Sequence, residues 1–297
     1  DVCSSDLEQD AGPMENFTFK AESRVAPAVK TAAPRALIPV LPGTNGEYDA
    51  AKALEDAGIK AEFFVVRNLR AEEIAQSAEG FAEAVRDAQL IVLPAGFSGE
   101  GEPDKNASFV TAFFRNAAVR ESVNELLERR DGLMLGIAGG FEAMLKLGLL
   151  PYGSIKDIGD CGPMLTVNKI GRHQSRIVKL RVASNLSPWL AFTEPGEIYS
   201  AALSCAEGRF VADEETIRKL AAAGQIATQY VDDCGNAGGD IRCNPNGSAF
   251  AVEGISSPDG RVLGRTGHPE RVGSYLYKNV PGNYDMKMFL AAAKYFK

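Results

Sequence analysis

The chain has 297 residues, of which 45% are hydrophobic and 24% are charged, a composition typical of a globular protein with a full core. The formal net charge of −7 argues against a nucleic-acid-binding surface, and the sequence has no apolar run of about 18 residues that could span a membrane. Five scattered cysteines argue against a disulfide framework and favour a reducing, cytoplasmic location.

Residues 1–34 are rich in Ala, Pro, Ser and charged residues and show no periodicity. We predict that they form a linker, or a non-native leader at their start, and that residues 35–297 form one folded domain. Cys234 and Cys243 flank a Gly-rich loop, but there is no CxxC pair and both histidines lie elsewhere in the sequence, so we expect no metal site.

The first half of the domain alternates apolar strands with amphipathic helices. The strands are expected at residues 35–41, 61–67, 88–96 and 132–137, each followed by a helical pattern. This alternation predicts an α/β fold, Rossmann-like or flavodoxin-like, with a mostly parallel sheet covered on both faces. In such sheets ligands bind beyond the carboxyl ends of the strands, and three of these four ends are Gly-rich.

The second half consists of short strands joined by turns. We expect them at residues 175–184, 198–204, 226–232, 249–256 and 261–268, followed by a final helix around 285–296. The pattern predicts a short antiparallel flap plus the remaining core strands.

The stretch GLMLGIAGGFEAM, residues 132–144, reads as a strand, a sharp corner and a helix. A corner of this form normally holds a nucleophile in a strained conformation, which requires small neighbours; Gly136 and Gly140 lie two residues on either side of Ala138. Gly139 would contribute a backbone N–H at the start of the helix, where developing negative charge is stabilised. Ala138 itself has no reactive group.

His268 and Glu270 lie two residues apart, so on an extended segment they point the same way and can hydrogen-bond. A histidine oriented by a carboxylate is the base of a catalytic triad. The turn LPAGF could supply a second oxyanion donor from Ala95 or Gly96.

Long ordered motifs of residues 35–297 resemble one family. They include IPVLPGTNGEYDAAKALEDAG, LPAGFSGEGEPD, EGRFVA, NPNGSAFAVEGI, GHPER and LYKNVPG. The chain is similar to the C-terminal, triad-type glutamine amidotransferase domain of phosphoribosylformylglycinamidine synthase. The resemblance implies a glutaminase that uses a Cys, a His and a Glu to release ammonia from L-glutamine. The ammonia would serve an ATP-dependent synthetase region, which is not within this sequence and would need ATP and Mg; the domain itself would need no cofactor.

The resemblance aligns His268 and Glu270 with the family's His and Glu, and Ala138 with its Cys. It places the substrate-binding positions at Ala95, Gly96, Phe97, Gly139, Phe141 and Glu142. Several of these positions depart from the family pattern. Residues 138–142 read Ala-Gly-Gly-Phe-Glu where the family has Cys-Asn-Gly-Phe-Gln, and Ala95, Cys205-Ala206 and Gly46 stand where Gly, His-Gly and Cys are usual.

We therefore expect glutaminase activity to be lost. A single engineered Cys→Ala change would explain Ala138 alone, so we favour natural loss. Cys205 is an alternative candidate for the nucleophile, but we favour the interpretation that it is a small buried side chain, which is how a free cysteine usually behaves. Ser98 is a weaker candidate, and we expect it to be a turn residue. His173 is expected to be structural. Two functions stay open: the glutamine amidotransferase domain of the synthase, or a non-catalytic pseudo-amidotransferase that acts as a structural, interaction domain.

Overall fold

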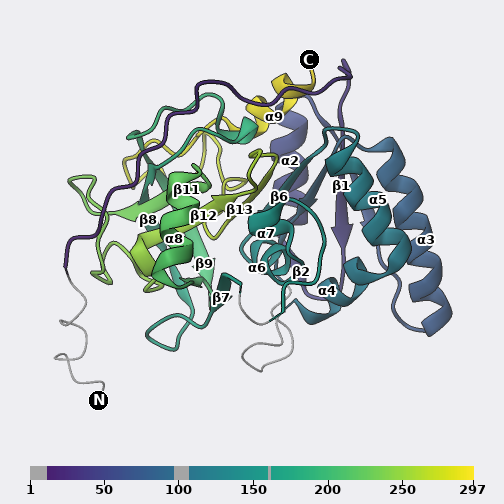
Figure 1. Ribbon diagram of the computed structural model, residues 1–297, viewed down its shortest axis with the longest axis horizontal. Helices are drawn as coiled ribbons and strands as arrows, with labels where there is room; N and C mark the ends of the chain where they lie inside the picture. The colour runs from purple at the N-terminus through teal and green to yellow at the C-terminus, as the bar shows by residue number, and fades with distance from the viewer. Residues whose placement is uncertain (1–11, 97–106, 160–161) are drawn as a thin grey trace.

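The computed structural model describes residues 12–96, 107–159 and 162–297 and is organised around a nine-stranded sheet in the order β3-β1-β4-β6-β13-β12-β11-β8-β9 (Figure 1). The strands of this sheet are β1 (Arg35–Val40), β3 (Lys60–Val65), β4 (Leu90–Leu93), β6 (Leu133–Ile137), β8 (Gln174–Val182), β9 (Ile198–Cys205), β11 (Ile226–Val231), β12 (Val252–Ser256) and β13 (Val262–Arg265). The helices are α2 (Glu47–Asp56), α3 (Ala71–Asp87), α4 (Ser108–Arg115), α5 (Ala117–Glu128), α6 (Gly139–Lys146), α7 (Leu149–Tyr152), α8 (Glu214–Ala222) and α9 (Met288–Phe296), with short 3-10 turns η1 (Pro188–Leu190) and η2 (Ala249–Ala251).

The parallel half of the sheet confirms the predicted α/β class. Strands β3, β1, β4, β6 and β13 run parallel to one another. Their segments are apolar because helices cover them on both sides, except at the edge strand β3, where Phe63 is 43% and Val65 is 63% exposed. An edge strand has one neighbour fewer, which explains this exposure.

The second half of the chain extends the same sheet. Strands β12, β11, β8 and β9 pair antiparallel to one another, and β12 joins the parallel half through β13. Two small antiparallel pairs lie outside the main sheet: β7 (Met164–Thr166) with β10 (Arg209–Val211), and β2 (Thr44–Asn45) with β5 (Ala95–Gly96). Most of the strands expected in the flap thus belong to the central sheet.

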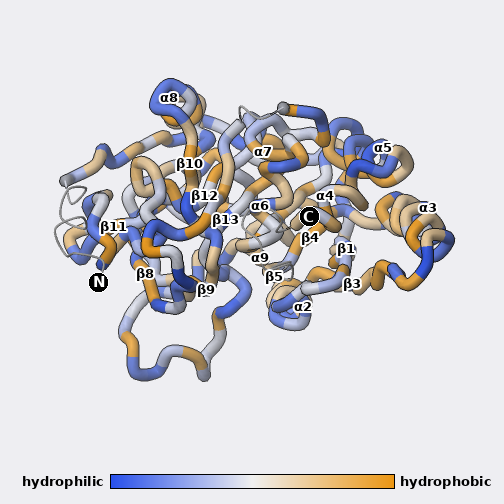
Figure 2. Tube along the Cα trace, turned by 90° about the horizontal axis from the view of Figure 1, so that it is seen from below, coloured by the Kyte–Doolittle hydropathy of each residue, from blue (hydrophilic) through white to orange (hydrophobic). Residues whose placement is uncertain are grey.

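Hydrophobic side chains form one cluster on each face of the sheet. One cluster gathers residues of α3 to α8 and includes Phe81, Phe114 and Phe141; the other gathers α2, η1 and α9 and includes Trp189 and Phe296. Figure 2 shows the hydrophilic sides of α2, α5 and α8 at the surface and hydrophobic stretches in the strands between them. The molecule therefore has three layers, with the sheet in the middle.

The segment of residues 12–34 lies along the body of the protein, where the sequence predicts a linker. Phe17 is 7% exposed and its N–H donates to Gln229 Oε1 at 2.8 Å. The N–H groups of Phe19 and Thr31 donate to the carbonyls of Ala183 and Phe296, both at 2.8 Å. Figure 1 shows this segment, in purple, crossing the molecule toward α9. The first 11 residues lie outside the described part.

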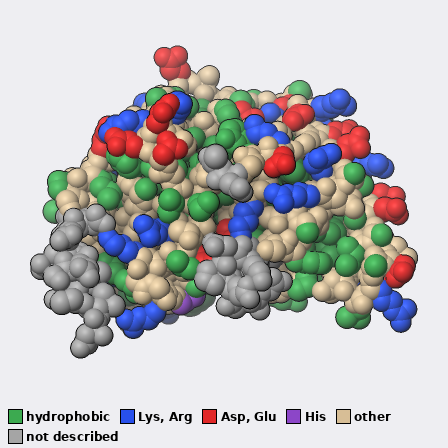
Figure 3. Space-filling view, turned by 60° about the horizontal axis from the view of Figure 1, so that its bottom comes forward, with side chains coloured by type: hydrophobic (Ala, Val, Ile, Leu, Met, Phe, Trp, Pro, Cys, Tyr) green, Lys and Arg blue, Asp and Glu red, His purple; other side chains and the backbone are tan. Residues whose placement is uncertain are grey.

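The surface carries charges of both signs. On the face shown in Figure 3, basic and acidic side chains are interspersed rather than separated into a single basic stripe. Within the described ranges, no helix is long and apolar enough to cross a membrane.

Candidate active site

Ala138 occupies the sharp corner between β6 and α6. Its φ of 48° and ψ of −108° lie in a region that residues with a Cβ rarely adopt. The Ala138 N–H donates to the Arg265 carbonyl at 2.8 Å, and the Ala138 carbonyl accepts the Glu142 N–H at 3.1 Å. These contacts fix the corner, and they do so without a reactive side chain at its tip.

The corner requires glycine on both sides, as the sequence predicts. A Cβ at Gly136 would lie 2.7 Å from Met144 Sδ, and one at Gly140 would lie 2.3 Å from the Leu93 carbonyl oxygen. Both distances are shorter than van der Waals contact, so larger residues would displace α6 from β6. Gly139 begins α6, and N–H groups in the first turn of a helix have no partner within the helix. The corner therefore retains backbone donors suited to a developing negative charge.

His268 and Glu270 form the predicted hydrogen bond. His268 Nδ1 lies 2.6 Å from Glu270 Oε1, and the residues are 2% and 4% exposed. A carboxylate can only accept a hydrogen bond, so Nδ1 is the ring nitrogen that donates to Glu270. The His268 N–H donates to the Ala202 carbonyl at 2.9 Å, which attaches this segment to β9.

Strand register brings the corner and the histidine segment to one edge of the sheet. Arg265 of β13 pairs with Ile137 of β6, so the segments that follow both strands leave the sheet side by side. Strand β4 also pairs with β6 in parallel, so Ala95, which follows β4, lies at this edge as well. This is the carboxyl edge at which α/β sheets bind ligands.

Gly46 lies against Glu270. A Cβ placed on Gly46 would be 3.7 Å from Glu270 Oε1 and 4.0 Å from Ala95 Cβ. The start of α2, the β5 turn and the carboxylate of the histidine pair thus meet at one place. Gly96 has a φ of 105° and approaches the Gly43 carbonyl so closely that a Cβ would lie 2.2 Å from it, so this turn also requires glycine.

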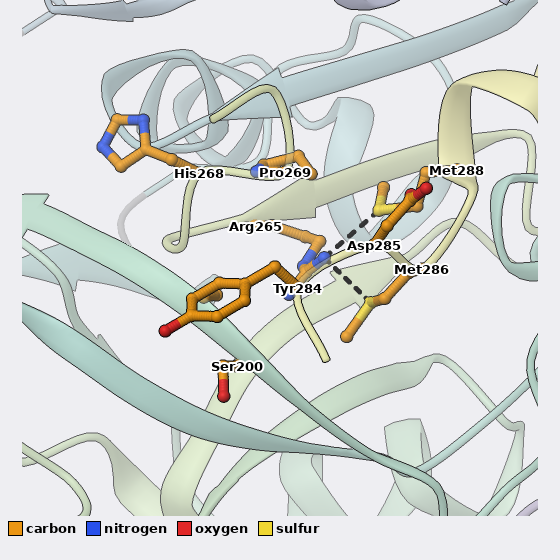
Figure 4. Close-up of a pocket in the computed structure, with 9 residues that line it drawn as sticks. Ser200, Arg265, His268, Pro269, Tyr284, Asp285, Met286 and Met288 are labelled. Atoms are coloured by element: carbon orange, nitrogen blue, oxygen red, sulfur yellow. Dashed lines mark hydrogen bonds between the residues drawn. The ribbon is translucent and has the colours of Figure 1, made fainter. Parts of the chain in front are cut away.

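A buried ion pair supports the histidine segment. Arg265 Nε lies 3.1 Å from Glu253 Oε2, and Glu253 Oε1 accepts the Gly267 N–H at 2.6 Å. The residues of this pair are 1% and 0% exposed, and Thr228 also donates its hydroxyl to Glu253. Figure 4 shows the Arg265 guanidinium directed toward Met286 and Met288, whose Sδ atoms lie 3.2 and 3.1 Å from Nη1. This pair was not predicted from the sequence, although the single Glu within the apolar run AVEGI was a usable signal for it.

The other predicted substrate-binding residues are placed differently. The Phe141 ring is fully buried against Gly264, where it packs α6 onto β13. Glu142 is 3% exposed and pairs with Lys146 at 2.7 Å, so its carboxylate is held by a cation of its own helix. Phe97 and Ser98 lie outside the described residues.

Cys205 is not poised to act as a nucleophile. Burial raises the pKa of its thiol to about 12, an effect that the contact with Asn246 Oδ1 at 3.7 Å only partly opposes. The thiolate is the attacking form of cysteine, so this side chain stays inert at neutral pH. It behaves as the small buried residue that the sequence favours.

His173 lies nearer to this edge than its sequence position suggests. Its Nε2 is 3.1 Å from Ser204 Oγ, while Nε2 of His268 is 3.4 Å from the Ser204 carbonyl oxygen. The antiparallel pairing of β8 with β9 brings His173 to Ser204, and an antiparallel bridge between His268 and Ala202 brings the second histidine there. Sequence spacing could not reveal this contact. Across the residues that the structure describes, no group of three or more His, Cys, Asp or Glu could hold a metal ion.

Comparison with known proteins relates the whole described fold to one family. The profile of the CobB/CobQ-like glutamine amidotransferase domain matches residues 33–296. The phosphoribosylformylglycinamidine synthase subunit PurQ of Treponema denticola is 31% identical over 251 residues, covering 80% of this chain and 87% of that protein. The same subunit of Methanococcus maripaludis strain S2 is 30% identical over 262 residues, covering 87% of this chain and 88% of the relative. A chain from the structure of PurLQS from Thermotoga maritima superposes with a TM-score of 0.62 at 25% identity, covering 89% of this chain and 100% of that one.

Proposed function

The chain belongs to the family of CobB/CobQ-like glutamine amidotransferase domains, and from this premise we propose that it is the glutamine amidotransferase part of a phosphoribosylformylglycinamidine synthase, with its glutaminase step lost. The observation that carries the proposal is Ala138, which keeps the strained backbone of a nucleophile corner with only a methyl group at its tip. The PurQ relatives support the assignment to purine biosynthesis.

In a triad glutaminase, a thiolate attacks the side-chain amide carbon of glutamine and the C–N bond breaks. The histidine, having taken the thiol proton, returns it to the leaving ammonia, and water then hydrolyses the thioester to glutamate. In this chain His268 and Glu270 retain the geometry of the base and its orienting acid, and α6 retains N–H groups at its start. Ala138 cannot form the thioester, and loss of the nucleophile in a covalent mechanism lowers kcat by about 10⁶.

The proposal assigns partners by the chemistry of the family. L-glutamine would occupy the edge between Ala138 and the β5 turn, and the synthetase region of the enzyme would use ATP and Mg. This domain needs no cofactor of its own. With its glutaminase inert, the assembled synthase would draw on free ammonia. The free cysteines Cys205, Cys234 and Cys243 fit a reducing, cytoplasmic location.

A second candidate is a pseudo-amidotransferase that serves as a structural, interaction domain of the synthase. The observation that favours it is the carboxylate of Glu142, which takes the place of an amide and is paired with Lys146. Several site positions would then have changed because glutamine no longer needs to bind.

The assay compares ammonia release from glutamine by the unsubstituted chain, by Ala138→Cys and by Ala143→Cys. Ala143 is a buried alanine of α6 away from the corner and serves as the matched control. We expect ammonia release by Ala138→Cys and by neither of the other two proteins. This result would mean that the absent thiol at position 138 is the main cause of the lost activity. If Ala138→Cys is silent and calorimetry detects no glutamine binding, the structural candidate is favoured. Ammonia release by the unsubstituted chain would overturn the proposed loss.

A further inference from the structure

A cleft of about 340 Å³ lies apart from the candidate active site and shares no residue with it. It is formed where β10 meets the loop before η2, and it is lined by Met14, Lys169, Arg209, Phe210, Val211, Gly239, Asn244, Gly247, Ser248, Ala249 and Phe250. Its volume falls in the range of small-molecule sites, about 300–1,000 Å³. In Figure 2, β10 and α8 lie at the end of the molecule opposite α3.

Arg209 is the unpaired cation of this cleft. Its side chain is half-buried, and Nε is buried without a hydrogen-bond partner. Within the described ranges no carboxylate pairs with its guanidinium, whereas the buried Arg265 and the half-buried Arg261 each contact an acid at 3.1 Å or less. A buried donor without a partner costs about 1–3 kcal/mol, and more when it is charged. The arrangement therefore favours an anionic partner from outside the fold.

Lys169 brings a second positive charge to the same cleft. Its N–H donates to the Asn246 carbonyl at 3.0 Å, and its Cβ would lie 2.8 Å from a Cβ placed on Gly247. Because Gly247, whose φ is 76°, has no side chain, the aliphatic part of Lys169 can pack against its backbone. Arg209 and Lys169 therefore both line this cleft, in a chain whose net charge is −7.

The loop that contributes Asn244–Phe250 to the cleft leads into a strained turn. Phe250 and Ala251 have φ values of 48° and 55°, a left-handed conformation that residues other than glycine rarely adopt. The preceding turn is fixed by Asn244, whose Oδ1 accepts the Ser248 N–H and whose Nδ2 donates to the Ser248 carbonyl, both at 2.9 Å. Backbone strain of this kind persists where surrounding contacts enforce it, and it is concentrated at ligand sites.

We propose that this cleft binds a small phosphate-bearing metabolite. The Arg209 guanidinium would pair with the phosphate oxygens through its fork of N–H donors, and Lys169 would add a point charge. Two cations match a phosphate group, which carries about −1.5 to −2 charges at pH 7, better than a single carboxylate. The cleft is larger than a phosphate ion, so the apolar surfaces of Met14, Val211 and Phe250 would contact the organic part of the ligand.

The test is calorimetric titration of the full chain with inorganic phosphate, phenyl phosphate and benzoate at low ionic strength. We expect phenyl phosphate to bind more tightly than phosphate, because it also reaches the apolar wall, and more tightly than benzoate, because of its charge. Arg209→Gln should weaken phenyl phosphate binding at least about tenfold, the usual effect of losing a charged hydrogen bond. Arg120→Gln, an exposed change on α5 that alters net charge equally, should leave binding unchanged.

Thermal unfolding without ligand shows whether Arg209→Gln still folds, and Arg209→Lys provides a second variant that keeps the charge but loses the fork. We expect the lysine variant to bind with intermediate affinity. Benzoate binding as tight as phenyl phosphate binding would overturn the phosphate assignment. The absence of binding at about 10 mM phenyl phosphate, or equal loss of affinity in Arg209→Gln and Arg120→Gln, would overturn the site itself. None of these readouts depends on glutamine chemistry.

Discussion

Glu270 Oε1 lies 2.6 Å from His268 Nδ1 inside the protein, and the corner between β6 and α6 carries only a methyl group, at Ala138. Each side chain of the pair is 1% exposed, and Arg271 approaches the same carboxylate oxygen at 3.6 Å. This contact is the one that the proposed base and its orienting acid would require. This relationship makes the remaining machinery testable once a thiol is introduced.

Glu270→Gln in the Ala138→Cys background should lower kcat for ammonia release by about 10²–10⁴, because an amide can donate to the ring and select the wrong tautomer of His268. KM should change little, since Glu270 acts through His268. Steady-state kinetics of the two proteins measure this, with Glu55→Gln, an exposed carboxylate of α2, as the control. Equal kcat values in both variants would contradict the orienting role.

Ala138→Gly should stabilise the unsubstituted chain by about 1 kcal/mol. The change relieves backbone strain of about 1–3 kcal/mol at a φ of 48°. The greater conformational freedom of glycine in the unfolded chain offsets about 0.5–1 kcal/mol of this gain. Urea unfolding gives the difference. Ala143→Gly, the same change inside α6, should destabilise by at least about 1 kcal/mol. Equal destabilisation by both changes would show that the corner stores no strain.

Arg265→Met should reduce the free energy of unfolding by about 3–5 kcal/mol. The change leaves the fully buried Glu253 carboxylate without its cation, and an uncompensated buried charge is strongly unfavourable. Urea unfolding of the variant and of Arg120→Met measures the effect. The exposed α5 change should stay within about 0.5 kcal/mol, and a similarly small loss for Arg265→Met would mean that the buried pair contributes little.

Because of Cys205, the free energy of unfolding should fall as the pH rises above about 8.5, the ordinary pKa of a thiol. Burial raises its folded-state pKa to about 12, so the unfolded chain loses this proton first and the stabilising contribution declines between these two values. Urea unfolding at pH 8 and pH 10.5 should show a steeper loss for the unsubstituted chain than for Cys205→Ala, by up to about 1.4 kcal/mol per pH unit. Cys234→Ala, which removes an exposed thiol, is the control, and equal slopes in all three proteins would rule the effect out.

The sequence predicted the local elements well because their signals are local. The apolar run LMLGI and the glycines around Ala138 predict a buried strand and a tight corner, since only small residues fit there. The two-residue spacing of His268 and Glu270 likewise predicts their hydrogen bond. The strands of the second half were predicted individually, and some were expected to complete the core sheet. Which strands join it, and in what order, was not predicted, because pairing partners are set by packing rather than by spacing.

The amino-acid sequence by itself determined the alternation of strands and helices, the glycine corner and the absence of a sulfur at position 138, because each depends on the identity of residues close together in the chain. Only the tertiary structure decided that Gly46 and Ala95 lie beside Glu270 and that Glu253 and Arg265 pair in the core. It also decided that Arg209 lines a cleft and has no acidic partner among the described residues. These relationships join residues from different segments, and the physical reason is that the burial of apolar surface on both faces of the sheet fixes which segments meet.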